Sequence, residues 1–211
     1  MAIIRNSVFG SFSGKVGEGV SYKLNGQDIV RSLPSKRRGP LSEKEKMNRL
    51  KFATSQKWLA PLIDFLRIGF KGYQPTYEGF VAAKSYNHKH ALQVNESNEF
   101  FINPALAMIS FGTQPLPHTV SATCTAEHEI IVTWSKEGEY LFTDFAMLVI
   151  YNTSKKKAYG NIAAAMRLAG TVKYTLPDFE IGNDFEVYLA FSSLDQKNRT
   201  NSMYLGMITS I

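Results

Sequence analysis

Phe185-Glu186-Val187-Tyr188-Leu189-Ala190-Phe191 is the stretch that decides the fold of this chain, because its large apolar side chains stand at every second position. Such alternation is typical of a β-strand that presents one face to a core. Residues 129–134 repeat the pattern, and residues 145–151 are apolar throughout, as expected for an inner strand that is buried on both faces. These segments predict antiparallel β-structure in the second half of the chain.

Short runs of this kind continue from Gln114-Pro115-Leu116-Pro117 to the end of the sequence, with glycines between them. Runs at this spacing are typical of two antiparallel sheets packed as a sandwich. Residues 161–168 fit either a strand or a short helical insert. We therefore predict an α+β protein with a domain boundary near residue 115, which divides the chain into residues 1–114 and residues 115–211.

The second predicted domain resembles a fibronectin type III or related immunoglobulin-like sandwich over residues 113–211. Trp134 stands where that family places a core tryptophan on its second strand. The segment from Leu176 to Gly182 is similar to the leucine–proline–glycine–tyrosine segment that precedes the sixth strand of the family. Phe185 stands where the family usually carries the tyrosine of the tyrosine corner, so the corner hydrogen bond is not expected.

The first half of the chain is predicted to hold a β-hairpin and about three helices. Val20-Ser21-Tyr22-Lys23-Leu24 precedes Asn25-Gly26, a pair that suits the positive φ angles of a type I′ turn. Ser42-Glu43-Lys44-Glu45 is a capping box, which predicts the start of a helix, and Pro61 separates that helix from the next. The further predicted elements are helices over residues 62–70 and 77–92 and strands over residues 100–102 and 106–111.

The first half is also similar to an uncharacterised family of Bacteroidota that has about this total length. The similarity rests on three motifs, which are Gly14-Lys15-Val16-Gly17, Trp58-Leu59-Ala60-Pro61-Leu62 and Ala83-Lys84-Ser85-Tyr86-Asn87. This family is a domain of unknown function without an assigned activity. The resemblance therefore implies an architecture and supplies no mechanism.

The charge of the chain is unevenly distributed along its 211 residues. Lysine and arginine number 16 against 6 acidic residues in positions 1–90, and 8 against 12 in positions 91–211, so the net charge of +6 comes from the first part. A basic region favours polyanions or acidic proteins as partners, and a solvated surface has the same composition. Cys124 is the one cysteine of the sequence, which excludes an internal disulfide.

No apolar run approaches the ~20 residues that a membrane-spanning helix needs. The first residues, Met1-Ala2-Ile3-Ile4-Arg5-Asn6, lack the charged and apolar regions of a secretory signal. We therefore expect a protein without a membrane span that is cytoplasmic by default. A surface protein or a component of a particle would have the same features over this stretch.

Three motifs resemble catalytic or ligand-binding patterns and lack essential parts. The run from Gly10 to Val16 is one residue short of a phosphate-binding loop and ends in valine, where that loop needs a hydroxyl for Mg²⁺. His88 and His90 face opposite sides of the predicted helix, so they are not expected to hold one metal ion together. Acidic neighbours of Cys124 disfavour a reactive thiolate. We predict no catalytic residue, no metal and no cofactor.

The basic stretch around the first helix is the best candidate binding surface. It supplies six side chains that could contact phosphates or an acidic partner, namely Lys36, Arg37, Arg38, Lys44, Arg49 and Lys51. Trp58, Tyr73 and Tyr77 add rings that could stack on bases. The competing interpretation is an ordinary solvated helix face, because Lys44, Lys51 and Lys57 lie roughly opposite the apolar stripe of the helix.

These features favour a non-catalytic structural, assembly or recognition protein whose ligand is another protein or a second copy of the chain. Further candidate contact surfaces are the hairpin residues Tyr22, Lys23 and Arg31 and the loops near Tyr140 and residues 155–157. The alternative is a nucleic-acid-binding protein that uses residues 36–57. An enzyme is the third class, and no catalytic constellation in the sequence favours it.

Overall fold

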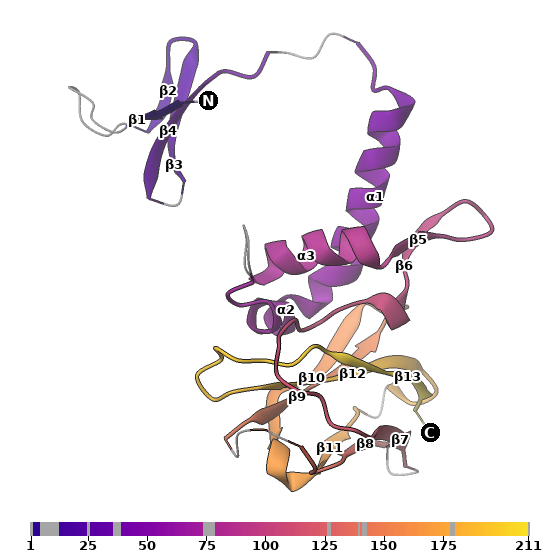
Figure 1. Cartoon of the computed structure of the whole chain (residues 1–211). Coiled ribbons are helices and arrows are strands. Elements are labelled where there is room, and N and C mark those ends of the chain that lie inside the picture. The colour runs from indigo at the N-terminus through magenta and orange to yellow at the C-terminus, as the bar shows by residue number, and fades with distance from the viewer. Residues whose placement is uncertain are drawn as a thin grey trace. The chain divides into compact units, whose positions relative to one another are not determined.

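The computed structural model describes residues 2–4, 13–24, 26–35, 39–73, 79–125, 128–138, 140, 143–177 and 180–210. The chain forms two compact units, Met1–Ser42 and Glu43–Ile211 (Figure 1). Strands occur in both units, and the helices α1, α2 and α3 belong to the second. The predicted mixed α+β class is therefore confirmed.

The first unit is a four-stranded sheet with the order β1-β4-β3-β2. Its strands are β1 (Ala2–Ile4), β2 (Gly14–Val16), β3 (Gly19–Leu24) and β4 (Gln27–Ser32). The predicted hairpin is confirmed, because β3 and β4 pair antiparallel along their whole length. Gly26 has a φ of 78°, as the predicted turn requires, and Asn25 lies outside the described residues.

Three helices open the second unit: α1 (Glu43–Leu59), α2 (Ile63–Gly69) and α3 (Gly79–His90). α1 begins one residue after Ser42, where the capping box predicts it. Pro61 lies in a 3-10 turn, η1 (Ala60–Leu62), between α1 and α2, since proline lacks the amide hydrogen that an uninterrupted helix would need. Gly69 ends α2 against the backbone of Ile109, where a Cβ atom would come within 2.1 Å of the carbonyl oxygen.

Two antiparallel sheets form the rest of the second unit. One has the order β11-β8-β7 and consists of β7 (Val120–Cys124), β8 (Glu129–Trp134) and β11 (Thr171–Thr175). The other has the order β10-β9-β12-β13 and consists of β9 (Phe145–Asn152), β10 (Lys157–Met166), β12 (Asp184–Ser192) and β13 (Met203–Thr209). The two sheets share one core, whose buried residues include Ile130, Val132, Trp134, Leu148, Ile150, Val187 and Leu189.

A small hairpin between the helices and these sheets differs in part from the prediction. β5 (Leu92–Val94) pairs with β6 (Phe100–Ile102), but residues 106–111 form no strand. Here the Met108 N–H donates to the side-chain oxygen of Asn87 at 2.7 Å, and the Met108 carbonyl accepts from its amide nitrogen at 2.8 Å. A buried side chain thus replaces the neighbouring strand. The helical alternative for residues 161–168 is also wrong, since β10 occupies most of that segment.

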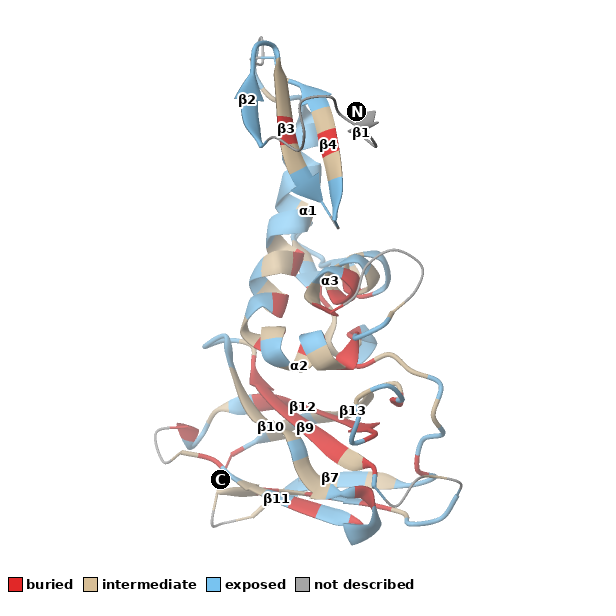
Figure 2. Cartoon of the chain, turned by 90° about the vertical axis from the view of Figure 1, so that its left-hand side faces the viewer, coloured by how far each residue is buried: buried red, intermediate tan, exposed pale blue. Residues whose placement is uncertain are grey.

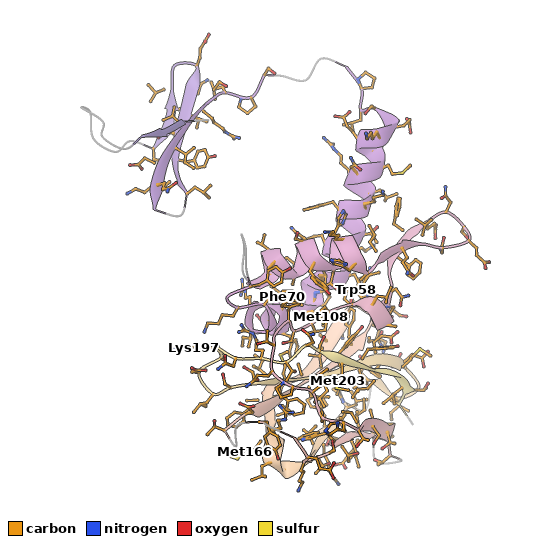
Figure 3. All side chains as sticks on the ribbon, in the orientation of Figure 1. Trp58, Phe70, Met108, Met166, Lys197 and Met203 are labelled. Carbon is orange, nitrogen blue, oxygen red and sulfur yellow. The ribbon has the colours of Figure 1, made fainter. Side chains whose placement is uncertain are left out.

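The four-stranded sheet lies at the centre of the second unit, because both of its faces are buried (Figure 2). Met147, Val149 and Tyr151 alternate along β9 with residues of the shared core and pack instead against the helices. Phe70 and Met108, both labelled in Figure 3, belong to this second core. The apolar character of residues 145–151 therefore follows from a layer of helices on the outer face of the sheet.

The boundary that we expected between residues 114 and 115 lies inside this unit. Helices from the first predicted domain and strands from the second share one apolar core, which contains Leu59, Leu66, Val149 and Ala190. A division at that point would expose the buried faces of both layers to water. The structure divides the chain at residue 42 instead.

Candidate functional site

The predicted basic residues that the structure describes do not gather into one patch. Three of the six lie outside the described residues, and their role stays a prediction: Lys36, Arg37 and Arg38. Lys44 and Lys51 are seven residues apart on α1 and share one side of the helix, whereas Arg49 faces the other side. The Lys51 ammonium lies 5.1 Å from the centre of the Phe100 ring on β6.

Phe100 lies in a groove between α1 and the β5–β6 hairpin, and we call it the α1 groove. Its larger part is a hollow of about 470 Å³, lined by Thr54, Lys57, Trp58, Phe100, Phe101, Ile102, Pro104, Tyr151, Thr153 and Lys156. A second hollow of about 240 Å³ shares Phe100 with the first and is lined by Glu43, Lys46, Met47, Leu50, Asn98 and Phe100. The α1 groove comprises both hollows.

The central sheet holds the aromatic walls of the α1 groove in place. The Tyr151 hydroxyl donates a 2.9 Å hydrogen bond to the carbonyl oxygen of Trp58, and the two rings meet edge to face with centres 5.1 Å apart. The Tyr188 hydroxyl donates a 2.8 Å bond to the carbonyl oxygen of Pro104, after β6. Burial raises the pKa of Tyr151 to about 12. Trp58, labelled in Figure 3, is thus a fixed wall near the end of α1.

Large apolar side chains of the groove are exposed. Met47 and Leu50, one turn apart on α1, are 48% and 55% exposed, and Phe101 on β6 is 37% exposed. Neighbouring exposed apolar side chains are typical of an interaction surface. The α1 residues that line the groove run from Glu43 to Trp58, which corresponds to about 22 Å at the rise of an α-helix.

Two exposed lysines line the larger hollow of the groove, Lys57 on α1 and Lys156 in the turn after β9. The pKa of the Lys156 ammonium is lowered by hydrogen bonding to the Lys57 side chain, by burial and by the positive charge of Lys57. Neither lysine forms an ion pair with a carboxylate of the described residues. Lys156 has a φ of 54°, in the left-handed region that residues other than glycine rarely adopt. The larger hollow therefore holds two neighbouring positive charges without a compensating acidic group among the described residues.

Both hollows lie within a segment that matches a known protein family. The family model is described as "Family of unknown function (DUF6266)" and matches residues 11–206. The chain belongs to the DUF6266 family. The match confirms the expected membership of a family without an assigned activity. Comparisons with curated proteins and with solved structures gave no significant match.

The histidines of α3 in this DUF6266 chain have structural partners. His88 and the buried hydroxyl of Ser55 are joined by a 2.9 Å hydrogen bond, and the His90 ring packs on Tyr86 with centres 4.5 Å apart. Cys124 is half-buried on β7. Within the described part of the chain, no three His, Cys, Asp or Glu side chains are grouped so that they could hold a metal ion. No helix in that part is long and apolar enough to cross a membrane.

The other predicted contact residues lie away from the α1 groove or outside the description. Tyr73 packs on Phe111 in the helix–sheet core, with ring centres 5.0 Å apart, and Tyr77 falls outside the described residues. In the first unit, the Arg31 guanidinium lies 5.6 Å from the centre of the Tyr22 ring. Use of this hairpin as a contact surface stays a prediction.

Sequence reasoning found several parts of the groove in this DUF6266 chain without joining them. It selected Lys51 and Trp58 for binding, and the loop at residues 155–157 as a contact surface. It missed Phe100 and Tyr151, because their pattern is that of ordinary strand residues. The two sides of the groove lie up to about one hundred positions apart in sequence, so no local motif connects them.

Proposed function

We propose that this chain is a non-catalytic recognition protein whose α1 groove binds an acidic, amphipathic segment of a partner protein. The observation that carries this proposal is the presence, in one groove, of exposed apolar side chains and of two lysines, Lys57 and Lys156, that form no ion pair with a carboxylate of the described residues. Met47 and Leu50 would contact apolar side chains of the segment, and Lys57 and Lys156 would attract its acidic groups. An amphipathic helix in an apolar groove is a recurring mode of peptide recognition.

The dimensions of the groove support a segment rather than a small molecule alone. About 22 Å of α1 lines it, which matches roughly four turns of a bound helix. The Tyr151 hydroxyl donates a hydrogen bond to the backbone carbonyl of Trp58, and the two rings pack edge to face, so little ordering of this wall is needed when a partner binds. The larger hollow is lined by aromatic and aliphatic side chains, by threonines and by lysines, a composition that supports ligand binding.

We also infer that residues 113–211 form a sandwich of the fibronectin type III kind, which serves as the scaffold for the groove. The seven strands from β7 to β13 make two antiparallel sheets around a shared core, which supports this inference. Trp134 lies on the second of these strands and Phe185 near the start of the sixth, as the resemblance implies. The helices on the outer face of the four-stranded sheet are an addition to that scaffold.

Replacing Lys51 by glutamate is expected to weaken the binding of an acidic amphipathic peptide about tenfold, because the change removes an attraction and adds a repulsion beside the groove. The probe is a fluorescein-labelled helical peptide of about fifteen residues with leucines on one face and glutamates on the other. Fluorescence anisotropy with the full chain at ~50 mM salt gives the Kd.

Arg49→Glu is the matched control for this measurement. Arg49 lies on the other side of α1 and its replacement changes the net charge equally, so we expect its Kd to stay within about twofold of the unaltered chain. Equal weakening by both variants would show that net charge alone attracts the peptide, and that outcome rejects the groove. Absence of binding at ~0.1 mM peptide rejects the proposal as a whole.

A second copy of the chain is the other expected source of such a segment. Sedimentation at increasing concentration distinguishes the two sources. A dimer that dissociates in Lys51→Glu but persists in Arg49→Glu would assign the segment to the chain itself. A monomer that still binds the peptide would assign it to another protein.

The second candidate function is the binding of single-stranded nucleic acid in the same groove. The rings of Trp58, Phe100 and Phe101 lie beside lysines there, and successive bases stack on such rings while lysines contact phosphates. A labelled oligothymidine in the same anisotropy experiment tests this candidate. Affinity that falls steeply between ~50 and ~200 mM salt and is lost in Lys51→Glu would favour nucleic acid over an acidic protein.

A further inference from the structure

The presence of Lys57 and Lys156 in the lining of one hollow is the feature of the groove that a general attraction for acidic partners does not explain. Like charges repel, so two ammonium groups usually separate unless an anion lies between them. Here Lys57 comes from the last turn of α1 and Lys156 from the turn between β9 and β10, and both line the larger hollow. The fold therefore brings together two cations that are remote in sequence.

The backbone at Lys156 supports a role for its side chain. Lys156 has a φ of 54°, which glycine or asparagine would adopt at lower cost. The turn is otherwise well built, because the Lys155 N–H donates a 2.8 Å hydrogen bond to the side-chain oxygen of Asn152. A lysine in the left-handed position of this turn places a cation at the groove at the expense of local conformational preference.

The other residues of the larger hollow complete a site for an aromatic ring with an anionic substituent. Trp58 forms an apolar wall that the buried ring of Tyr151 supports, and the threonines at positions 54 and 153 bring hydroxyl donors to the same lining. A volume of about 470 Å³ is within the range of small-ligand sites. Two cations match an anion of two charges better than a carboxylate, which has one.

We propose that the Lys57–Lys156 end of the α1 groove is a seat for a phosphate monoester on an aromatic ring, supplied by a phosphorylated tyrosine in the bound protein segment. A phosphate monoester carries about two negative charges at pH 7 and three acceptor oxygens, enough for both ammonium groups and a threonine hydroxyl. This inference rests on the proposed function, since it names the chemical group of the partner that enters the larger hollow.

The two tryptophans of the chain allow a test with an internal control. Trp58 lines the larger hollow, whereas Trp134 is buried in the core between the two sheets. We expect phenyl phosphate, added to the ¹⁵N-labelled full chain, to shift the indole N–H signal of Trp58 in a saturable manner and to leave that of Trp134 in place. Trp58→Phe assigns the two signals.

Two lysine variants test the seat itself. Lys57→Gln and Lys156→Gly are each expected to raise the Kd for phenyl phosphate about tenfold, because each removes a charged hydrogen bond to the phosphate. Glycine suits the left-handed position, so Lys156→Gly should keep or raise the melting temperature. Arg49→Gln removes the same charge from α1 about two turns before Lys57 and outside the lining of the groove, so it should leave the Kd within about twofold.

Benzoate, adenosine monophosphate and inorganic phosphate define the specificity of the seat. Benzoate has one charge and should bind about tenfold more weakly than phenyl phosphate, and inorganic phosphate lacks the ring and should also bind more weakly. Equal binding of benzoate and phenyl phosphate would overturn the proposal, as would a Trp58 signal that does not shift. Tighter binding of adenosine monophosphate would assign the seat to a nucleotide and overturn the assignment to tyrosine.

The same experiments separate this inference from the proposed function. If the acidic peptide binds and responds to Lys51→Glu while phenyl phosphate does not bind, the groove is a recognition site without a phosphate seat. If phenyl phosphate binds and the peptide does not, the partner segment is rejected, and with it the phosphorylated tyrosine as the source of the phosphate.

Discussion

Replacement of Asp144 by alanine is expected to lower the free energy of unfolding by about 3–5 kcal/mol, because it leaves a buried arginine without its counter-ion. Asp144 is fully buried, and its carboxylate lies 4.0 Å from the guanidinium of Arg167, which is 1% exposed. Without the carboxylate, the guanidinium would keep its charge in a site that water does not reach. The loss therefore exceeds that expected for an exposed ion pair.

The residues around Arg167 explain why its guanidinium group stays charged and away from solvent. Its guanidinium carbon lies 4.6 Å from the centre of the Tyr140 ring and 4.5 Å from that of Phe191, and one terminal nitrogen donates a 2.9 Å bond to the Pro115 carbonyl oxygen. Burial lowers the pKa of Arg167, and the charge of Asp144 opposes that change. Nε and Nη1 of Arg167 and Oδ1 of Asp144 have no hydrogen-bond partner within the described residues.

Urea unfolding followed by circular dichroism measures the predicted loss. Asp64→Ala is the control, since Asp64 is 77% exposed and its pairing with Arg67 at 3.8 Å should contribute less than about 1 kcal/mol. A double variant, Asp144→Leu with Arg167→Met, should recover most of the stability, because apolar residues can replace a buried ion pair at little cost. A loss below about 1 kcal/mol in Asp144→Ala would contradict the assignment.

Asn87→Leu is expected to lower the free energy of unfolding by about 2–4 kcal/mol, because it removes the side chain that pairs with the backbone of Met108. Asn87 is fully buried on α3 and makes three hydrogen bonds of 2.7–2.9 Å, two to Met108 and one to the Ala83 carbonyl oxygen. Leucine has a similar volume and offers no donor or acceptor. The N–H and C=O of Met108 would then be left without partners inside the protein.

Ser85→Ala provides the matched control on the same helix. Ser85 is exposed, so its replacement should change the free energy of unfolding by no more than about 0.5 kcal/mol. Asn87→Asp separates hydrogen bonding from volume, because a carboxylate cannot donate to the two carbonyl oxygens and would carry a charge into the core. Asn87→Asp should therefore be at least as unstable as Asn87→Leu, and full stability in either variant would refute this account.

Much of the fold was predictable from the sequence, and the reason is local chemistry. The pair Asn25-Gly26 indicates a hairpin, and β3 and β4 form it; the capping box at Ser42 indicates a helix, and α1 begins there. The alternation in residues 185–191 indicates β12. Each signal depends on residues within one turn or one strand, where backbone geometry and side-chain direction are set by near neighbours.

Prediction was less successful where a distant group replaces a local one. Residues 106–111 have the composition of a strand, yet the amide of Asn87 takes the place of a partner strand at Met108. The apolar outer face of β9 indicated burial correctly, but it did not identify helices as the cover. The expected division near residue 115 failed for the same reason, since the helices and strands on either side of it share a core.

The sequence by itself determined the class of most elements and the uneven charge of the chain, because both depend on composition and on short-range pattern. The candidate site was decided by the tertiary structure. Lys57 and Lys156 are about one hundred positions apart, and they line one hollow because α1 packs at the end of β9, where Tyr151 contacts Trp58. The helices bury the outer face of the sheet and thereby bring Lys57 and Lys156 to one hollow. No short-range pattern in the sequence predicts this packing.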